Sequence, residues 1–151
     1  MPQSLAAVYV HIVFSTKDRR PLIQPKGLRA ELHAYLGEIC DHLGCAPIIV
    51  GGVDDHVHIL ARQSRTIAMA DWVQKLKTGS SSWIKTRSPD LRHFSWQGGY
   101  GAFSVGSDGV DRVRAYIGDQ EEHHRVVSFQ DEFRKLLEAH GLDWNEKYVW
   151  D

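Results

Sequence analysis

The sequence predicts an α+β fold, with an antiparallel sheet that carries helices mainly on one face and additional helices at the C-terminal end. Two observations support this class. Short runs rich in β-branched and aromatic residues alternate with longer segments whose apolar residues recur at helical spacing. Two of the strand-like runs, at 46–50 and 56–61, are separated by a short turn, which indicates antiparallel pairing.

The first half of the chain supplies three strands and one helix. Residues 8–14 predict a first strand, and a basic, proline-containing loop follows them. From about 26 to 43 the apolar residues share one helical face, and Gly44 ends this helix. Residues 46–50 and 56–61 predict the second and third strands, which we expect to pair as a hairpin.

A second helix and a fourth strand come next. Thr66 can cap the helix, which we expect to continue past Gly79 through Trp83. The apolar residues of its inner face are Met69, Trp72, Val73 and Leu76. After a glycine-rich turn, residues 102–105 predict the fourth strand.

Helices complete the predicted fold. A third helix begins at Asp108 or Asp111 and reaches about His124, and a last helix runs from Ser128 to Gly141. The order is therefore β-α-β-β-α-β followed by helices, which is the ferredoxin-like arrangement. Because many unrelated activities use this arrangement, the fold alone does not indicate a function.

The composition is that of a soluble globular protein. With 151 residues, 42% of them hydrophobic, we expect a single domain over 1–151. No apolar run is long enough to cross a membrane and no export signal is recognisable, so we expect a cytoplasmic protein. Cys40 and Cys45 form no CxxC pair and are expected to be reduced packing residues.

A nucleic-acid partner would need a local basic surface, because the net charge is only −1. The candidate DNA-binding residues are Lys17, Arg19, Arg20, Lys75, Lys77, Lys85 and Arg112. For any one cluster, solvated helix faces and loop ends are the favoured explanation. Three aromatic residues, Trp83, Trp96 and Tyr100, could stack on unpaired bases.

The third strand carries a histidine pair. His56 and His58 are two residues apart, so their side chains point to the same face of the sheet. Two neutral imidazoles at this spacing can bind one divalent metal ion. A strand with a polar, solvent-facing side would show the same pattern. Asp55 could orient a ligand or could simply form the turn.

Tyr116 and Gln120 are four residues apart on the third helix and therefore share a face. If that helix packs on the histidine side of the sheet, Gln120 can add an oxygen ligand and Tyr116 can present its hydroxyl. Alternatively, Tyr116 is a boundary aromatic with a solvated hydroxyl. His123 and His124 diverge by about 100° around a helix, so they are not expected to hold one ion jointly.

Four segments together resemble a known family. They are FSTKDRRPLI at 14–23, DDHVHIL at 54–60, WQGGYGAFSV at 96–105 and AYIGDQ at 115–120. In this order they are similar to the HUH-type single-tyrosine transposases of the insertion-sequence-200-like family, and they cover most of residues 8–125. The segment from 128 to 151 is less diagnostic.

The resemblance implies a DNA transposase that cleaves and rejoins single-stranded DNA at short hairpins or palindromes through a 5′-phosphotyrosine. It implies Tyr116 as the nucleophile and His56, His58 and Gln120 as ligands of Mg²⁺ or Mn²⁺. It also implies a homodimer whose active sites are shared between chains, associated with the nucleoid when bound to DNA. The alternatives are a metal-dependent phosphodiesterase that uses water, and a non-transposing nucleic-acid-binding module.

Overall fold

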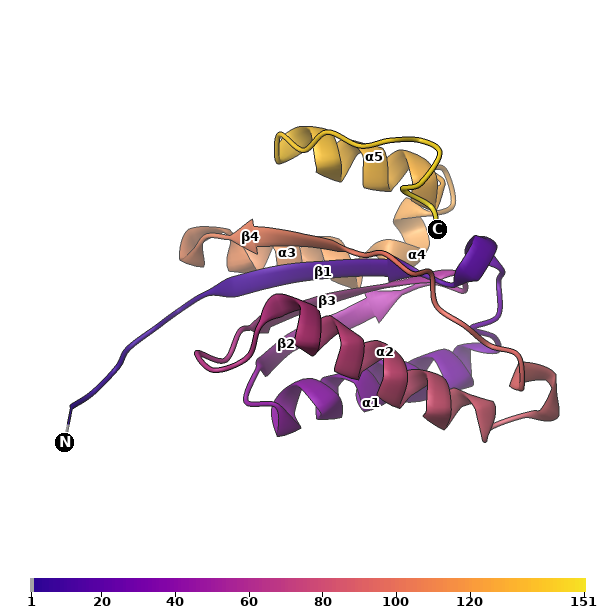
Figure 1. Cartoon of the computed structure of the whole chain (residues 1–151). Helices are drawn as coiled ribbons and strands as arrows, with labels where there is room; N and C mark the ends of the chain where they lie inside the picture. Colours follow the sequence, from indigo (N-terminus) through magenta and orange to yellow (C-terminus); the bar gives the residue numbers. More distant parts are fainter. Residues whose placement is uncertain (1) are drawn as a thin grey trace.

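The computed structural model describes residues 2–151 and contains a four-stranded sheet with helices on both faces (Figure 1). The strands are β1 (Tyr9–Ser15), β2 (Ala46–Gly52), β3 (His56–Arg62) and β4 (Gly101–Val105). Their order is β2-β3-β1-β4, and every neighbouring pair is antiparallel. The predicted hairpin of the second and third strands is confirmed. The α+β class is confirmed as well.

Two long helices cover one face of this sheet. They are α1 (Lys26–His42) and α2 (Met69–Lys85), which lie side by side below the strands in Figure 1. The larger core forms here because alternate residues of β1 and β3 face these helices. It includes Val10, Ile12, Phe14, Val57, Ile59, Leu32, Leu36, Trp72 and Leu76, all of them buried.

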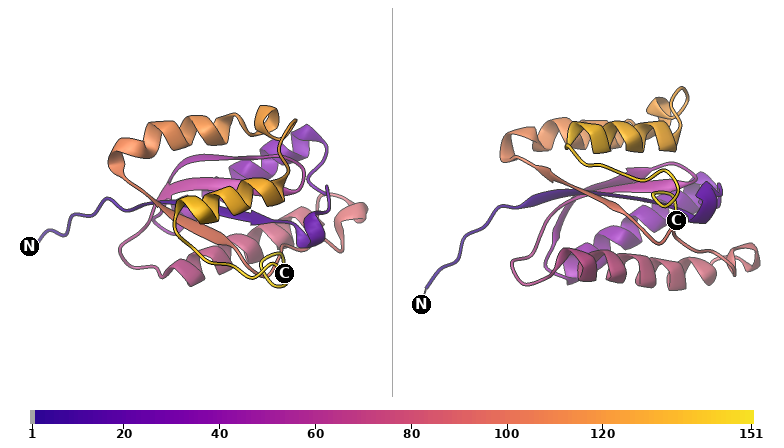
Figure 2. Two further views of the ribbon diagram at one scale, coloured as in Figure 1. Left: turned by 90° about the horizontal axis from the view of Figure 1, so that it is seen from above. Right: turned by 45° about the horizontal axis from the view of Figure 1, so that its top comes forward.

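The additional C-terminal helices lie on the opposite face, where Figure 2 shows α3 and α5 side by side. They are α3 (Val110–Gly118), α4 (Gln120–His123) and α5 (Phe129–Ala139). A smaller core forms between this layer and the sheet, from Val13, Phe103, Phe129, Phe133 and Leu137. The sheet is therefore buried on both sides, and the face of His56 and His58 is the one beneath α5.

Three local expectations are corrected by the structure. The second helix begins after Ala68, and the Thr66 hydroxyl contacts Ser64 instead of capping that helix. The predicted third helix is interrupted at Asp119, which separates α3 from α4. Trp96 is buried against Phe14 and is thus a core residue, with no face free to stack on a base.

Other expectations hold in the described residues. The second helix continues past Gly79 to Lys85 as predicted. Cys40 and Cys45 are free thiols, and both are buried. Within residues 2–151, none of the helices combines the length and the apolar character that a membrane crossing requires.

Candidate active site

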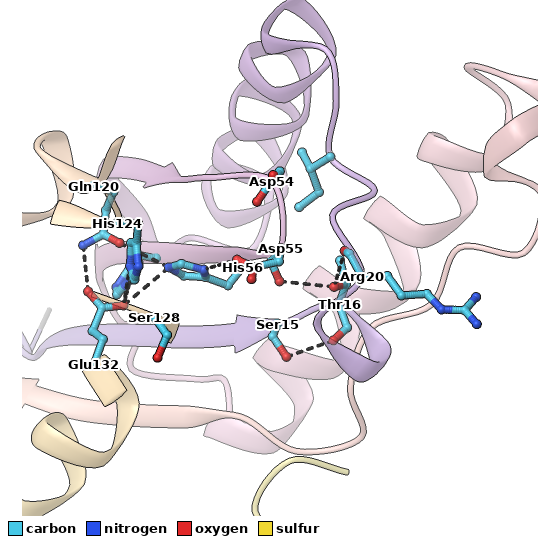
Figure 3. A network of polar contacts seen from close by, with 12 residues as sticks. Ser15, Thr16, Arg20, Asp54, Asp55, His56, Gln120, His124, Ser128 and Glu132 are labelled. Atoms are coloured by element: carbon cyan, nitrogen blue, oxygen red, sulfur yellow. Dashed lines mark hydrogen bonds and ion pairs between the residues drawn. The ribbon is translucent and has the colours of Figure 1, made fainter. Parts of the chain in front are cut away.

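The histidine pair of β3 lies in the protein interior between the sheet and α5. His56 and His58 have no exposed surface, so a polar, solvent-facing strand is the wrong interpretation of the pattern. Their position follows from the alternation of β3, because Val57 and Ile59 point into the core on the α1 and α2 side. Figure 3 shows His56 between Asp55 and Glu132.

Each of these histidines is oriented through its Nδ1 atom. His56 Nδ1 lies 2.7 Å from Asp55 Oδ1, which supports the orienting role considered for that carboxylate. His58 Nδ1 lies 2.7 Å from Nε2 of His11, a buried residue of β1. These contacts direct both Nε2 atoms toward the same point, as groups behind a metal ligand commonly do.

Glu132 lies where the Nε2 atoms of His56 and His58 converge, and its role was not predicted from the sequence. Its Oε1 atom lies 3.4 Å from His56 Nε2 and 3.0 Å from His58 Nε2, and the residue is 2% exposed. Ser128 begins α5 by accepting a hydrogen bond from the Asp131 amide, which places Glu132 in the first turn. One signal was available, since an acidic residue here interrupts the predicted apolar stripe of the last helix.

Tyr116 and Gln120 reach the same carboxylate from α3 and the start of α4. The Tyr116 hydroxyl and the Gln120 side-chain amide both donate hydrogen bonds to Glu132 Oε2, the second over 3.0 Å. Gln120 Oε1 accepts from His56 Nε2 at 3.2 Å. The two side chains thus converge on the histidine pair of their own chain, although Asp119 interrupts the helix between them.

A glycine allows the tyrosine helix to lie this close to the sheet. A Cβ atom on Gly51 of β2 would stand 2.8 Å from the Ile117 carbonyl oxygen and 2.8 Å from its Cγ2 atom. Contacts closer than about 3 Å would force α3 away from the strand. The absence of a side chain at Gly51 therefore helps to fix the position of Tyr116 one residue earlier.

His124 also joins the site, which the sequence analysis did not anticipate. Its Nε2 atom lies 3.0 Å from Glu132 Oε1, while His123 Nε2 lies 3.3 Å from the other oxygen, Oε2. The two neighbouring rings are nearly perpendicular, at 85°. Of these two histidines, His124 belongs with His56, His58 and Glu132 to a group of side chains whose donor atoms lie close enough to hold one ion.

Burial makes the charges of the site strongly interdependent. Burial opposes ionisation of Glu132, but hydrogen bonds to His124, His56 and His58 outweigh it and hold the carboxyl pKa well below its usual range. Burial would lower the pKa of His56, yet Asp55 and Glu132 raise it to about 9.

His58 and Tyr116 shift in the opposite sense, toward their neutral forms. Burial lowers the pKa of His58 to about 4, although Glu132 opposes this. Burial and the hydrogen bond to the Glu132 carboxylate raise the pKa of Tyr116 well above its usual value. Without a bound metal ion, these pKa shifts favour a charged His56, a neutral His58, an ionised Glu132 and a protonated Tyr116.

The donor atoms are suited to a divalent cation. One ligand atom from each of His56, His58, His124 and Glu132 lies within 4.8 Å of the others. Glu132 Oε1 lies 3.0 to 3.4 Å from the Nε2 atoms of the three histidines, close to the separation of about 3 Å between neighbouring ligands in an octahedral site with bonds of about 2.1 Å. Imidazole, carboxylate and amide oxygen suit Mn²⁺, Mg²⁺ and Zn²⁺, so the residues fit a metal ion without identifying it.

The basic residues considered for DNA binding are dispersed, and only one approaches Tyr116. Arg112 lines the cavity beside the tyrosine. Lys77 is engaged within the protein, because its Nζ atom donates to the carbonyls of Gln97 and Gly99 at 2.7 and 2.6 Å. Lys75 and Lys85 are exposed on α2, on the other side of the sheet. Near the end of β1 lie Lys17, Arg19 and Arg20.

Comparisons with known proteins identify the group to which this chain is related. A family model described as transposase IS200 like matches residues 4–120, a range that includes His56, His58, Tyr116 and Gln120. Glu132 and His124 lie beyond it. A search of curated proteins found no match.

Two solved structures share the fold. A predicted transposase from Deinococcus radiodurans R1 is 19% identical with a TM-score of 0.62, over 80% of this chain and 95% of that one. A REP-associated tyrosine transposase bound to a REP hairpin is 10% identical with a TM-score of 0.60, over 84% and 74%. The family model spans well over half of the residues of the present chain, and this chain therefore belongs to the IS200-like transposase family.

Proposed function

We propose that this protein cleaves and rejoins single-stranded DNA, with Tyr116 as the nucleophile. The observation that carries the proposal is the convergence of the Tyr116 hydroxyl, two imidazoles and the Gln120 amide on the Glu132 carboxylate. Membership of a transposase family supports a DNA-cleaving enzyme. A partly buried phenol among residues that can bind a metal is the arrangement expected of a covalent nucleophile.

His56, His58 and Gln120 would hold Mg²⁺ or Mn²⁺, as the resemblance implied. Glu132 and His124 have donor atoms in the same space and would contribute to the site. A bound divalent ion would offset the negative charge of the scissile phosphate and favour the ionised form of a nearby phenol. Such help is needed here, because the surroundings of Tyr116 raise its pKa.

The chemical step exchanges one phosphodiester bond for another. Tyr116 Oη loses its proton and forms a bond to phosphorus, while the bond from phosphorus to the 3′ oxygen breaks and that oxygen gains a proton. The products are a 5′-phosphotyrosine and a free 3′ hydroxyl. Attack by a 3′ hydroxyl on the phosphotyrosine reverses the bond changes, so rejoining needs no ATP.

The DNA substrate that we propose is a single strand bearing a short hairpin or palindrome. The shared fold with a tyrosine transposase bound to a REP hairpin supports this class of DNA. The exposed Lys17 and Arg20, together with Arg112, offer positive charge for the phosphate backbone.

A covalent-adduct assay tests the proposal. The purified protein is incubated with Mn²⁺ and 3′-labelled single-stranded DNA from the flanks of its own gene, and the products are separated by denaturing electrophoresis. We expect a slowly migrating adduct that Tyr116→Phe abolishes and that Tyr148→Phe, at an exposed tyrosine, leaves intact.

The alternatives give different results in the same assay. A phosphodiesterase that uses water would release cleaved DNA without an adduct, and Tyr116→Phe would retain that cleavage. A nucleic-acid-binding module would leave the DNA uncleaved and without an adduct. Either result would overturn the proposed chemistry.

The proposed homodimer with shared sites has its own test. In the described chain Tyr116 lies beside its own histidine pair, with ring centroids 5.8 Å apart for Tyr116 and His58. Mixing Tyr116→Phe with His58→Ala restores an adduct only if a tyrosine helix serves the partner's histidines. If no adduct returns, although each variant still binds DNA, the tyrosine acts within its own chain.

A further inference from the structure

We propose that a cavity beside Tyr116 binds one unpaired nucleobase, the one next to the phosphate that this tyrosine attacks. The inference rests on the proposed function, since it specifies which part of single-stranded DNA is held there. The cavity has a volume of about 510 Å³ and lies between β4, α3 and α5. Pockets that enclose small ligands typically measure about 300–1,000 Å³.

The walls of the cavity are apolar and partly aromatic. Phe103 comes from β4, Val113 from α3, and Leu136 and Ala139 from α5. The ring of His140, which is exposed, stacks on Phe103 with centroids 4.7 Å apart and an interplanar angle of 30°. A flat aromatic platform that is open on one side is the feature on which unpaired bases stack.

The inner end of the cavity is polar. Tyr116 and Glu132 line it together with His123, so the cavity leads to the hydroxyl that would attack the phosphate. His123 Nε2 is buried and makes no hydrogen bond, although it lies 3.3 Å from Glu132 Oε2. The Tyr116 hydroxyl and the Glu132 carboxylate give this end of the cavity hydrogen-bonding groups that suit the polar edge of a base.

Two exposed cations line the same cavity. Arg112 belongs to α3 and Lys135 to α5, and neither forms an ion pair with any residue in the described range 2–151. Besides Glu132, a second carboxylate, that of Asp108, also lines the cavity. Apolar walls, a polar inner end and two available cations match the faces, the edge and the phosphate of a nucleotide.

Methyl NMR of the whole protein with the four 2′-deoxynucleoside 5′-monophosphates tests the site independently of cleavage. The methyl groups of Val113 and Leu136 report binding, because both residues line the cavity. We expect these signals to shift with at least one nucleotide and not with deoxyribose 5-phosphate, which has the same phosphate but no base. Shifts with the sugar phosphate alone would indicate an anion site and overturn the proposal.

Matched variants locate the binding. Ala139→Trp fills the cavity and should weaken binding by roughly tenfold or more, the loss expected when one stacked base is displaced. Glu138→Trp is the control, because Glu138 is exposed on the same helix and does not line the cavity. Arg112→Gln should weaken binding, whereas Arg114→Gln should not. Equal effects within either pair would overturn the proposal.

The nucleotide-binding test and the adduct assay can contradict the cavity assignment and the covalent chemistry separately. Nucleotide binding without an adduct would leave the cavity assignment standing and reject the covalent chemistry. An adduct without nucleotide-dependent shifts at Val113 and Leu136 would support the covalent chemistry and reject the cavity assignment.

Discussion

The charge of His56 predicts a distinctive pH dependence of stability in the metal-free protein. Asp55 and Glu132 raise the pKa of this buried imidazole from 6.5 to about 9, against the effect of burial. A group with a raised pKa in the folded state stabilises the protein fully below its unfolded pKa and loses this contribution as the pH rises through the folded value. The stabilisation by His56 is therefore present below about pH 6.5 and is lost toward pH 9.

The size of the effect follows from the two pKa values. At about 1.4 kcal/mol for each tenfold change in proton affinity, the rise from 6.5 to about 9 corresponds to about 3 kcal/mol. Other groups, such as His58 and Lys77, also change the total stability with pH. The useful quantity is therefore the difference in unfolding free energy between the wild type and His56→Gln. Contributions from distant groups such as Lys77 largely cancel in it, whereas His58, whose pKa is lowered by His56, contributes to the measured difference.

Urea unfolding with EDTA, at several pH values between 6 and 9, measures this difference. We expect it to shrink by about 3 kcal/mol over that range. His42→Gln is the control, because His42 is exposed at the end of α1, and its difference from the wild type should stay nearly constant. A His56→Gln difference that stays constant or grows with pH would refute the charged state assigned to the site.

Two further predictions concern the helix that carries the tyrosine and the metal. Gly51→Ala should cost about 1–3 kcal/mol and reduce the yield of DNA adduct, because its Cβ would press on Ile117 and displace α3. Thermal melting and the adduct assay measure both effects, and Gly37→Ala, which meets no atom within 4 Å, should show neither loss. Mn²⁺ at about 100 times its dissociation constant should stabilise the wild type by about 2.7 kcal/mol in urea unfolding, and excess EDTA should reverse this. His58→Ala should remove most of that stabilisation, and an equal gain in this variant would place the ion elsewhere.

Local periodicity was sufficient to predict the order of the elements and part of the site. The hairpin of β2 and β3 follows from the short turn that separates them. The shared face of His56 and His58 follows from the two-residue repeat of a strand. Tyr116 and Gln120 are four residues apart, about one helical turn, which predicts that they share a face. Both side chains still reach Glu132, although α3 ends before Asp119. These features depend on neighbours in the sequence, and the sequence displays them directly.

Only the tertiary structure decided what stands at the centre of the site. Glu132 contacts His58, which lies 74 residues earlier in the sequence, and it also contacts His56. Both contacts depend on how α5 folds back over the sheet. His124 and Glu132 come from opposite sides of the turn before α5, so no spacing rule relates them to β3. The role of Lys77 within the protein was likewise decided by the loop that lies over α2. Sequence alone determined which residues share a face, because that is set by backbone geometry. Which faces meet was decided by the packing of whole layers, because the burial of apolar surface determines which layers join. That driving force is non-directional, so it does not specify which polar side chains become partners.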